Sequence, residues 1–383
     1  MVEWKKLGEV CDILNGFAFK RQEYVSEGIR IIRISDVQSG CISDKDKVFY
    51  PVEKVSEFER YLLHQGDLVM SLTGNPGRIA IIKDDSCALN QRVACLRAND
   101  VSRSFLFYLF NCKEFESIAF ANSTGGAQKN LSTAWLNNYR IPIPSLSEQS
   151  RIVSILDTFT SSISNLKQQI EERRKQYEYE RDLLLDLEGK EGVEMKKLGE
   201  VANFRNGKGH EKFVDSEGGY IVVNSKFISS NGTIRKFCKQ QISPLYIDDI
   251  LLVMSDVPNG KALAKCFLVD KDDLYTLNQR IGAFTVKNNK VYPKYLYSII
   301  NRNEQLLKYD NGIDQTNLRK DDILNINIPI PPLSTQSRIV SILDTFEQSI
   351  SNLEEQLAMR EKQYEYYRNQ LLTFEGEEER GKT

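Results

Sequence analysis

The sequence is poor in the residues that most enzymes and metalloproteins need. Of 383 residues only two are histidine and seven are cysteine, and the cysteines follow no C-x-x-C spacing. A zinc site or a disulfide framework is therefore not expected, and two histidines leave little for general acid–base chemistry. No run of eighteen apolar residues occurs, and no apolar segment follows the first lysines. We therefore expect a cytoplasmic protein with reduced thiols that does not span a membrane.

The motifs of nucleotide and methyl-donor sites are missing as well. The sequence contains no GxxxxGK[ST] phosphate loop, no G-x-G after a strand, no HExxH and no NPPY-type loop. Adjacent acids occur, as at Asp84–Asp85 and Asp321–Asp322, but turns and helix starts are the commoner reason for such pairs. We predict no catalytic residues, no metal site and no cofactor in this chain.

The chain does contain a long internal duplication. Residues 150–189 and 337–376 match at 27 of 40 positions without a gap, at an offset of 187, and both begin SRIVSILDTF. The rest of the chain repeats far more weakly. The architecture should therefore be interpreted from the repeat, whose shared part makes the same contacts twice. The diverged part is expected to recognise two different things.

Both copies of the duplicated segment carry apolar residues at alternating spacings of four and three. This pattern predicts a helix of ~60 Å, at ~1.5 Å per residue, with one apolar seam and a coiled-coil partner. The simplest partner is the other copy, packed antiparallel. Prolines predict an extended segment at 141–149 and at 328–336, and Gly189 and Gly376 stand where the helices should end. The seam residues that we expect to pair are Ile152, Leu156, Phe159, Ile163, Leu166 and Ile170 in the first copy, and Ile339, Leu343, Phe346, Ile350, Leu353 and Leu357 in the second.

Two arginines interrupt the apolar seam at equivalent positions, Arg173 and Arg360. One interpretation is that long side chains extend to solvent at a loosened seam. The other is that they make contacts that set the register of the helices. Near the first helix start, Ser145 and Glu148 have the spacing of a capping box.

The two globular halves share short phrases in the same order. They open with EWKKLGEVCDILNG and EMKKLGEVANFRNG, pass through ALNQRVACL and TLNQRIGAF, and contain one helical segment each. Short strands closed by a helical segment predict an α+β fold, twice. Residues 1–144 carry 18 basic and 17 acidic residues, and residues 194–333 carry 20 and 16. The globular halves are thus mildly basic, and they rather than the acidic helices would face a polyanion.

These phrases resemble the specificity subunits of Type I restriction–modification systems. The resemblance rests on an LNQR strand, a (G)xxQxxLS segment, IPIP followed by L-x-x-Q, and a long SRIVSILD helix, all repeated once. It covers essentially the whole chain. It implies target-recognition domain 1 at 1–144, conserved helical spacer 1 at 145–189, target-recognition domain 2 at 190–331, conserved helical spacer 2 at 332–376 and a charged tail at 377–383.

The resemblance also implies a function. The chain would be a non-catalytic subunit with two target-recognition domains of mixed α/β structure, separated by long antiparallel coiled-coil helices in a pseudo-twofold duplication. Each domain would read one half of a bipartite, asymmetric site in double-stranded DNA. The helices would set the spacer and dock two methyltransferase subunits, and whether restriction subunits also bind is left open. S-adenosylmethionine and ATP would be used by partner subunits.

The DNA-contacting residues cannot be carried over from the resemblance, because they are what varies in such subunits. From chemistry alone the candidates are Arg, Lys, Asn and Gln side chains in loops, which contact bases or phosphates; the alternative for each is a solvated surface side chain. The repeated Asn90-Gln91-Arg92 and Asn278-Gln279-Arg280 are expected to bond the domain's own backbone, with phosphate contact by the arginines left open. The candidates are Lys20, Arg21, Asn75, Arg78, Gln128 and Lys129 in the first domain, and Lys208, Lys212, Asn259, Lys261, Gln315 and Arg319 in the second.

Two other functions remain in competition with this one. A DNA-binding scaffold that dimerises through its coiled coil would act without a methyltransferase. A duplicated nuclease or methyltransferase would need a metal or S-adenosylmethionine site, for which the sequence has no motif.

Overall fold

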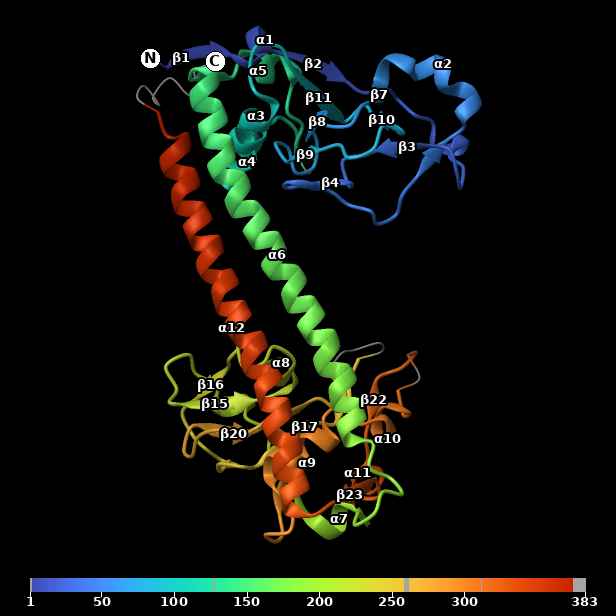
Figure 1. Cartoon of the computed structure of the whole chain (residues 1–383), viewed down its shortest axis with the longest axis vertical. Helices are drawn as coiled ribbons and strands as arrows, with labels where there is room; N and C mark the ends of the chain where they lie inside the picture. The colour runs from blue at the N-terminus through green and yellow to red at the C-terminus, as the bar shows by residue number, and fades with distance from the viewer. Residues whose placement is uncertain (1, 127, 258–261, 311, 375–383) are drawn as a thin grey trace. The chain divides into compact units, whose positions relative to one another are not determined.

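The computed structural model describes residues 2–126, 128–257, 262–310 and 312–374. Its residues form two compact units, Met1–Lys167 with Glu355–Thr383, and Gln168–Glu354. Each unit holds one globular repeat together with part of each long helix (Figure 1). The division therefore cuts across both helices and not at their ends.

The first globular repeat, blue to cyan in Figure 1, is built on two small sheets. One is antiparallel in the order β2-β11-β8-β9, and the other has the order β6-β3-β10-β7 with β3 and β10 parallel. Its strands are β1 Glu3–Lys6, β2 Cys11–Asn15, β3 Ile29–Ile32, β4 Val37–Gln38, β5 Cys41–Ile42, β6 Phe49–Tyr50, β7 Leu62–Leu63, β8 Leu68–Ser71, β9 Ile79–Ile81, β10 Cys87–Leu89, β11 Val93–Ala98 and β12 Arg140–Ile143. Its helices are α1 Leu7–Val10, α2 Val55–Phe58, α3 Arg103–Phe110, α4 Lys113–Ala121, α5 Thr133–Asn138 and the 3-10 turns η1 Arg21–Glu23, η2 Val52–Lys54 and η3 Glu59–Tyr61.

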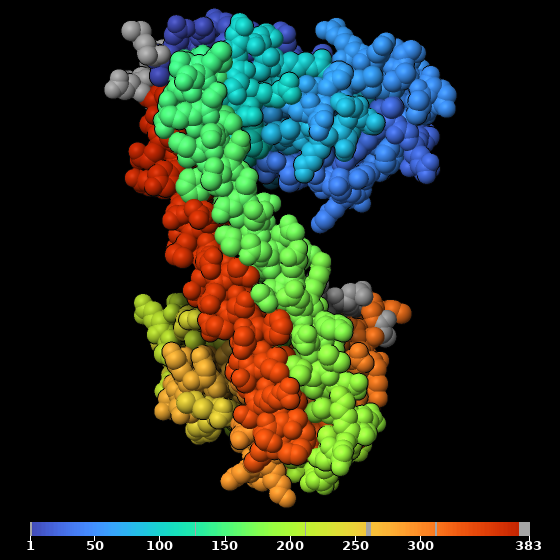
Figure 2. Space-filling view, viewed as in Figure 1, coloured from blue at the N-terminus to red at the C-terminus, as the bar shows by residue number. Residues whose placement is uncertain are grey.

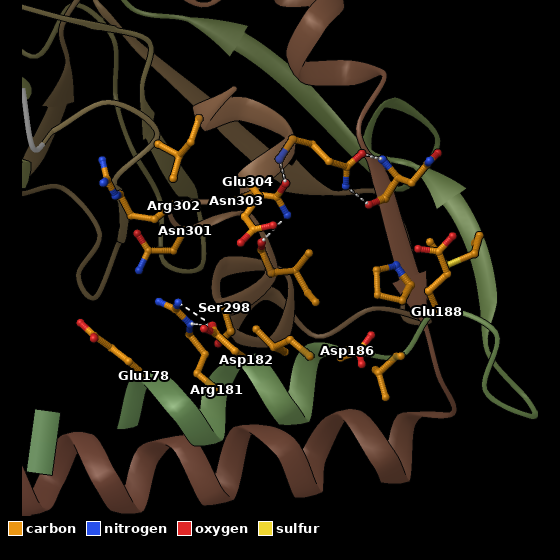
Figure 3. Close-up of a pocket in the computed structure, with 18 residues that line it drawn as sticks. Glu178, Arg181, Asp182, Asp186, Glu188, Ser298, Asn301, Arg302, Asn303 and Glu304 are labelled. Carbon is orange, nitrogen blue, oxygen red and sulfur yellow. Dashed lines mark hydrogen bonds and ion pairs between the residues drawn. The ribbon is translucent and has the colours of Figure 1, made fainter. Parts of the chain in front are cut away.

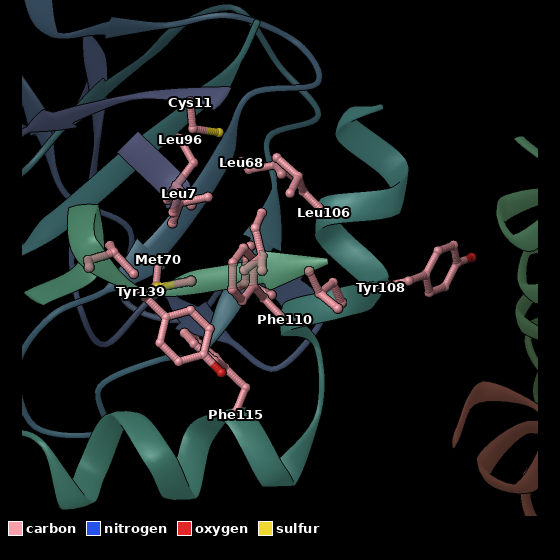
Figure 4. Packing of buried hydrophobic residues seen from close by; sticks show 14 of the residues in the cluster. Leu7, Cys11, Leu68, Met70, Leu96, Leu106, Tyr108, Phe110, Phe115 and Tyr139 are labelled. Carbon is pink, nitrogen blue, oxygen red and sulfur yellow. The ribbon is translucent and has the colours of Figure 1, made fainter. Parts of the chain in front are cut away.

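The main core of this repeat lies between the antiparallel sheet and helices α3, α4 and α5. Figure 4 shows Leu68 and Met70 of β8 facing Leu106 and Phe110 of α3. Side chains alternate along β8 and β11, so one face of each strand joins this core and the other joins a second apolar cluster. The first residues of the long helix after the repeat, including Ile152, belong to the same core.

The second globular repeat has the same four-stranded antiparallel sheet, but its second sheet has three strands instead of four. Its antiparallel sheet has the order β14-β21-β17-β19, and its second sheet has the order β16-β15-β20 with β15 and β20 parallel. Its strands are β13 Glu194–Lys197, β14 Ala202–Asn206, β15 Tyr220–Val223, β16 Phe237–Cys238, β17 Ile250–Val253, β18 Ser255–Asp256, β19 Cys266–Leu268, β20 Tyr275–Leu277, β21 Ile281–Val286, β22 Thr316–Asn317 and β23 Asn327–Ile330. Its helices are α7 Leu198–Val201, α8 Ser225–Ser229, α9 Pro293–Ile300, α10 Glu304–Leu307, α11 Lys320–Leu324 and the 3-10 turn η4 Glu211–Phe213.

The repeated topology agrees with the α+β duplication, but two local expectations were wrong. Each LNQR phrase is not one strand: β10 ends at Leu89, Asn90-Gln91-Arg92 forms a turn, and β11 begins at Val93. The single helical segment of each half is two helices, α3 and α4 or α9 and α10. In the first half the break lies at Cys112, whose sulfur accepts the Phe115 N–H and caps α4.

The two long helices, α6 Leu146–Leu185 and α12 Leu333–Leu372, pair antiparallel in each unit. In the first unit the Phe159 ring stacks on the Tyr367 ring at 5.3 Å, while Lys167, further along α6, pairs with Glu361, an earlier residue of α12. In the second unit Arg174 pairs with Glu354 at 2.5 Å. Along α6 the partner numbers fall as the residue numbers rise, so the predicted antiparallel pairing of the two copies is confirmed.

The seam positions lie on the covered side of this pair, and the pair itself contributes to the surface of each unit (Figure 2, green and red). No helix among the described residues is apolar over a length that would cross a bilayer. The structure buries Ile152, Leu156, Ile170, Ile339 and Leu343, and half-buries Phe159, Ile163, Leu166, Phe346, Ile350, Leu353 and Leu357.

The seam arginines contact aromatic rings of the opposite helix. The Arg173 guanidinium lies 5.8 Å from the centre of the Phe346 ring, and Arg360 lies 5.7 Å from that of Phe159. The two contacts join equivalent positions of the duplication, and a cation over an aromatic face is attractive. The structure thus supports the interpretation that these arginines make contacts between the helices.

The extended segments before the helices are shorter than predicted. Helix α6 begins at Leu146 and α12 at Leu333, because proline is tolerated at or just before a helix's first turn. Ser145 Oγ accepts the Glu148 N–H at 3.3 Å, which is one half of a capping box. The other half is missing among the described contacts, since the Glu148 carboxylate pairs with Arg151. Helix α6 ends before Gly189, which has a φ of 74°, and Gly376 lies outside the described residues.

A buried glutamine joins each long helix to its globular repeat. The Gln149 carbonyl accepts the N–H of Ser102, the N-cap residue of α3, at 2.7 Å, and its amide donates to the Pro144 carbonyl at 2.8 Å. Gln336 does the same with Tyr292, the N-cap residue of α9, and with Pro331. The repeated glutamine of the IPIP…L-x-x-Q phrase is therefore a structural joint.

Replacing this glutamine should destabilise the chain. Gln149→Ala leaves the Ser102 N–H and the Pro144 carbonyl buried without their partner, which we expect to lower the free energy of unfolding by about 2 to 4 kcal/mol. Denaturant unfolding monitored by circular dichroism measures the change. The exposed Gln169 on the same helix is the matched control, and Gln169→Ala should have little effect. Equal stability of the two variants would contradict the role of the joint.

Candidate functional site

The Asn90-Gln91-Arg92 turn is fixed by main-chain hydrogen bonds to three other segments. The Gln91 N–H donates to the Phe17 carbonyl at 2.8 Å, and the Asn90 N–H donates to the Ile32 carbonyl at 3.2 Å. The Arg92 carbonyl accepts the Leu72 N–H at 3.0 Å. Because the main chain of the turn is held on both sides, the Gln91 and Arg92 side chains project from a rigid support.

A glycine beside the turn allows this close packing in both repeats. A Cβ on Gly16 would lie 2.1 Å from the Asn90 carbonyl oxygen, and a Cβ on Gly207 would lie 2.1 Å from that of Asn278. No side chain fits at such a distance from a main-chain atom. The glycine that ends the shared opening phrase (DILNG, NFRNG) is therefore required by the turn.

A polar groove of about 420 Å³ lies beside the turn in the first unit. Thr73 and Asn130 bridge it from two segments, and the Thr73 hydroxyl donates to the Asn130 side-chain oxygen at 3.0 Å. Of the described residues that line the groove none is acidic, and one, an exposed arginine, is charged. The lining residues are Leu72, Thr73, Gln91, Arg92, Gln128 and Asn130.

The second unit repeats this arrangement at the equivalent positions. The Met254 N–H donates to the Arg280 carbonyl at 3.2 Å, as Leu72 does to Arg92. Ser255 pairs with Asn317 in the β18–β22 ladder, and the Gln315 amide donates to the Ser255 hydroxyl at 2.7 Å. Two domains with different loops thus share one polar cluster of a glutamine, a hydroxyl residue, an asparagine and an exposed arginine, which we call the NQR cluster. Its members are Gln128, Thr73, Asn130 and Arg92 in the first unit, and Gln315, Ser255, Asn317 and Arg280 in the second.

Three of the predicted DNA-contacting residues lie in or beside the NQR cluster. Gln128 and Gln315 occupy the same position in the two units. Lys208 is exposed and lies next to the turn, because its main chain bridges Asn278.

The other candidates of the first domain lie elsewhere. Arg78 is half-buried and donates to the Gln38 side chain at 2.9 Å, which is a structural contact. The Lys129 ammonium lies 5.4 Å from the centre of the Phe120 ring. Three other candidates are exposed: Lys20, Arg21 and Asn75.

Lys20 shares its acidic neighbour with another lysine. It lies 3.6 Å from Glu23, which Lys54 contacts at 2.7 Å. The hydrogen bonds from Lys54 and Tyr50 lower the pKa of the Glu23 carboxyl to about 2, so this carboxylate stays charged at neutral pH. A charged carboxylate beside Lys20 weakens its attraction for phosphate.

In the second domain Lys212 and Arg319 are exposed, and Arg319 is the N-cap residue of α11. Asn259 and Lys261 lie outside the described residues.

Burial makes the thiols poor nucleophiles. It raises the pKa of Cys11 and of Cys95 to about 12, with a smaller contribution from a neighbouring aspartate in each case. Burial also raises the pKa of Cys266 well above its usual value. These thiols stay protonated at neutral pH, so none of the three can act as a thiolate.

An acidic cleft of about 870 Å³ lies in the second unit between the end of α6 and the α9–α10 segment (Figure 3). Its lining includes five carboxylates against two guanidinium groups, and one of those, Arg181, is paired with Asp182 at 2.7 Å. This balance repels a phosphate backbone, so the cleft is not a nucleic-acid surface. The charged lining residues are Glu178, Arg181, Asp182, Asp186, Glu188, Arg302 and Glu304.

Four residues of the NQR cluster were not predicted from the sequence. Thr73 and Asn130, and their counterparts Ser255 and Asn317, were not candidates. A signal was present, because Q-x-N occurs at 128–130 and again at 315–317 at the same place in both repeats.

Comparison with known proteins identifies the family. The model of the Type I restriction modification DNA specificity domain matches residues 1–173 and again 190–359. The chain belongs to this family. Both repeats are covered, so the duplication is one of whole DNA specificity domains.

Relatives and solved structures agree with this assignment. The specificity subunit of Type I restriction enzyme EcoAI from Escherichia coli is 34% identical over 196 residues, which is 48% of this chain and 32% of that one. The putative type I restriction enzyme specificity subunit S.HindORF215P of Haemophilus influenzae is 28% identical over 97% of this chain and 96% of its own length. The chain thus matches only about a third of the EcoAI subunit. The crystal structure of the S subunit from M. genitalium shares the fold, with a TM-score of 0.60 at 16% identity over 98% of this chain and 96% of that one.

These matches confirm two predictions: the family, and the duplicated α+β fold with paired long helices. They do not bear on which residues contact DNA.

The glycine beside the turn provides a test of the rigid NQR cluster. Gly207→Ala should displace the Asn278 carbonyl and lower the free energy of unfolding by about 3 kcal/mol, since overpacking against main chain cannot relax cheaply. Thermal unfolding monitored by circular dichroism measures this. Gly219→Ala is the matched control in the same unit, because a Cβ there meets nothing within 4 Å. If both variants unfold like wild type, the close approach does not hold the turn.

Proposed function

We propose that the chain is the DNA-recognition subunit of a Type I restriction–modification complex, in which each globular domain reads one half of a bipartite, asymmetric site. The observation that carries this proposal is that the DNA specificity family covers both repeats. The two domains share their topology while their loops differ almost completely, and identical domains would read identical half-sites. Contacts to base edges specify sequence, and such contacts would come from the diverged loops.

The helices would serve assembly and spacing. A duplicated helix presents the same surface twice, which suits two copies of one methyltransferase subunit in a pseudo-twofold arrangement. Restriction subunits would join in complexes that cleave DNA. S-adenosylmethionine and ATP would be bound by those partners, in line with the missing donor and phosphate loops in this sequence.

Two separate observations argue against the two competing functions, and the pairing of the helices bears on the homodimeric scaffold. In each unit α6 pairs with α12 of the same chain, so the seam is already occupied and is not available for a coiled-coil homodimer. A nuclease or methyltransferase would need a donor or metal site. Among the described residues no cluster of three or more metal-ligating side chains is present.

Exchanging one domain tests the division of labour. Residues 17–140, which begin after Gly16 and end in β12, can be replaced by the matching segment of another specificity subunit. Methylome sequencing of a strain that carries the hybrid with its methyltransferase should show one half of the motif changed and the other retained. The reciprocal exchange of 208–327, the equivalent segment after Gly207, should change the opposite half. A hybrid in which both halves change would refute the proposal.

Lengthening both helices tests the role in spacing. Duplicating the heptads 167–173 in α6 and 354–360 in α12 adds seven residues to each helix and keeps the seam in phase. Seven residues add about 10.5 Å at ~1.5 Å per residue, or about three base pairs at ~3.4 Å each. We expect methylation to move to sites with a spacer longer by about three base pairs and with the same half-sites.

The control for this experiment is the insertion in α6 alone, which places the seams of the two helices out of register. It should lower complex formation without creating a new preferred spacer. If the double insertion methylates only the original spacing, the helices do not set the distance between half-sites.

A further inference from the structure

We propose that the NQR cluster of each domain is a phosphate-binding site that holds the DNA backbone without regard to sequence, with Arg92 and Arg280 as the cationic groups. This inference rests on the proposed function and adds to it a separate site for the sequence-independent part of binding. In a protein–DNA complex, contacts to phosphate fix position and contacts to bases carry specificity.

The repetition of the cluster indicates what it binds. Two domains that read different half-sites cannot use identical side chains at identical positions to tell those half-sites apart. The sugar–phosphate backbone is the part of DNA that both half-sites have in common. A cluster preserved in both domains, beside loops that differ, is therefore suited to the common part.

The cluster has the rigidity that positioning requires. In the first unit the turn is held by the main chain of β3, of Leu72 directly after β8, and of the segment after Gly16. In the second unit the Asn278 N–H donates to the Val223 carbonyl at 3.2 Å, and the Lys208 N–H donates to the Leu277 carbonyl at 3.0 Å. Such a support fixes the main chain from which the arginine projects, so that binding restricts only the side chain and not the turn itself.

Arg92 and Arg280 differ from two other arginines, Arg97 and Arg205, which have carboxylate partners. Arg92 and Arg280 are both exposed, and no hydrogen bond or ion pair to either guanidinium is found in the described part of the chain. Arg97, in strand β11 directly after the turn, instead pairs with Asp67 at 3.2 Å. Arg205 in the second domain pairs with the buried Asp249. An arginine with a built-in carboxylate partner supports the fold, whereas Arg92 and Arg280 keep their donors for a ligand.

The neighbours of these arginines favour an anion. The groove beside Arg92 is lined by amide and hydroxyl side chains, and of its described lining residues none carries a negative charge. In the second domain a carboxylate residue, Asp256, directly follows Ser255 of the cluster in β18. Its oxygens already accept the N–H groups of Val257, Ala262 and Leu263 at 2.7 to 3.1 Å. Guanidinium and amide N–H groups match phosphate oxygens, and arginine binds them in a two-pronged geometry.

The alternative ligand for an exposed arginine is a guanine base edge. It would require both half-sites to contain a guanine at the same place relative to the domain. The two ligands predict different results, because loss of a phosphate contact weakens binding to every sequence, whereas loss of a base contact relaxes specificity at one position.

The test measures DNA binding by the full chain in complex with its methyltransferase partner. The probes are a duplex that carries the methylated site and a duplex of equal length without it, over a range of salt concentrations. Arg92→Ala with Arg280→Ala should weaken binding to both duplexes by the same factor, roughly tenfold for each arginine. The slope of log Kd against log salt should fall by about 2, because each phosphate contact contributes about 0.9. The methylated sequence should stay the same.

Two further variants distinguish the loss of a phosphate contact from a folding defect and from a general loss of positive charge. Arg92→Lys with Arg280→Lys should keep most of the salt slope, because lysine also neutralises a phosphate. Arg60→Ala with Lys236→Ala removes two exposed charges elsewhere, one in each domain, and should leave slope and affinity near wild type. An equal effect of this control pair would overturn the proposal.

Unchanged affinity and slope in the alanine variant would also overturn it, and so would a loss confined to the specific duplex with an altered methylated base. The outcome is distinguishable from failure of the proposed function. If the wild-type complex showed no sequence preference but its salt slope still depended on the two arginines, the function would fail and the phosphate site would stand.

Discussion

The buried side-chain amides of Gln149 and of its counterpart Gln336 connect each long helix to its globular repeat. The side-chain oxygen of each glutamine accepts the N–H of the N-cap residue of α3 or α9. Its amide group donates to the carbonyl of the proline before the long helix. A buried polar group of this kind is stable only with its partners in place. The orientation of the helix start on its domain is thereby fixed by directional bonds as well as by apolar packing, which would tolerate sliding.

Charge is distributed unevenly over the grooves of the described structure. The groove beside Arg92 has a positive group and neutral donors, whereas the cleft at the end of α6 has five carboxylates against two guanidinium groups. A chain with a net charge of −2 can bind a polyanion only if its acids are kept away from the contact surface. In the described structure many acids near the basic loops are already engaged, as Glu23 is by Lys54 and Asp256 by main-chain N–H groups.

The sequence predicted the architecture well, because the evidence for it is periodic and repeated. Heptads identified the helices and their need for a partner, and the duplication identified the partner helix, its antiparallel direction and two α+β domains. Boundaries were less predictable: proline at a helix start is compatible with both an extended and a helical residue, so α6 and α12 begin earlier than expected. The NQR phrase looked like strand because apolar residues flank it, and its turn depends on Gly16 or Gly207, which are distant in sequence. Long-range main-chain contacts of this kind leave little local signal, and the same holds for Arg78, whose partner Gln38 comes from another segment.

Duplication also strengthens the register of the helix pair. Because the two copies pack antiparallel, a contact between residues that both copies share can occur twice, as with Arg173 on Phe346 and Arg360 on Phe159. A slip of one heptad would keep apolar residues opposite one another at most seam positions, so hydrophobic burial alone discriminates weakly between registers. The same slip would remove both cation–ring contacts at once, each about 0.5 to 2 kcal/mol. An arginine in the seam thus favours one register of the helix pair, whereas a leucine there would add buried apolar area without selecting a register. Because the contact occurs twice, the preference for that register is doubled.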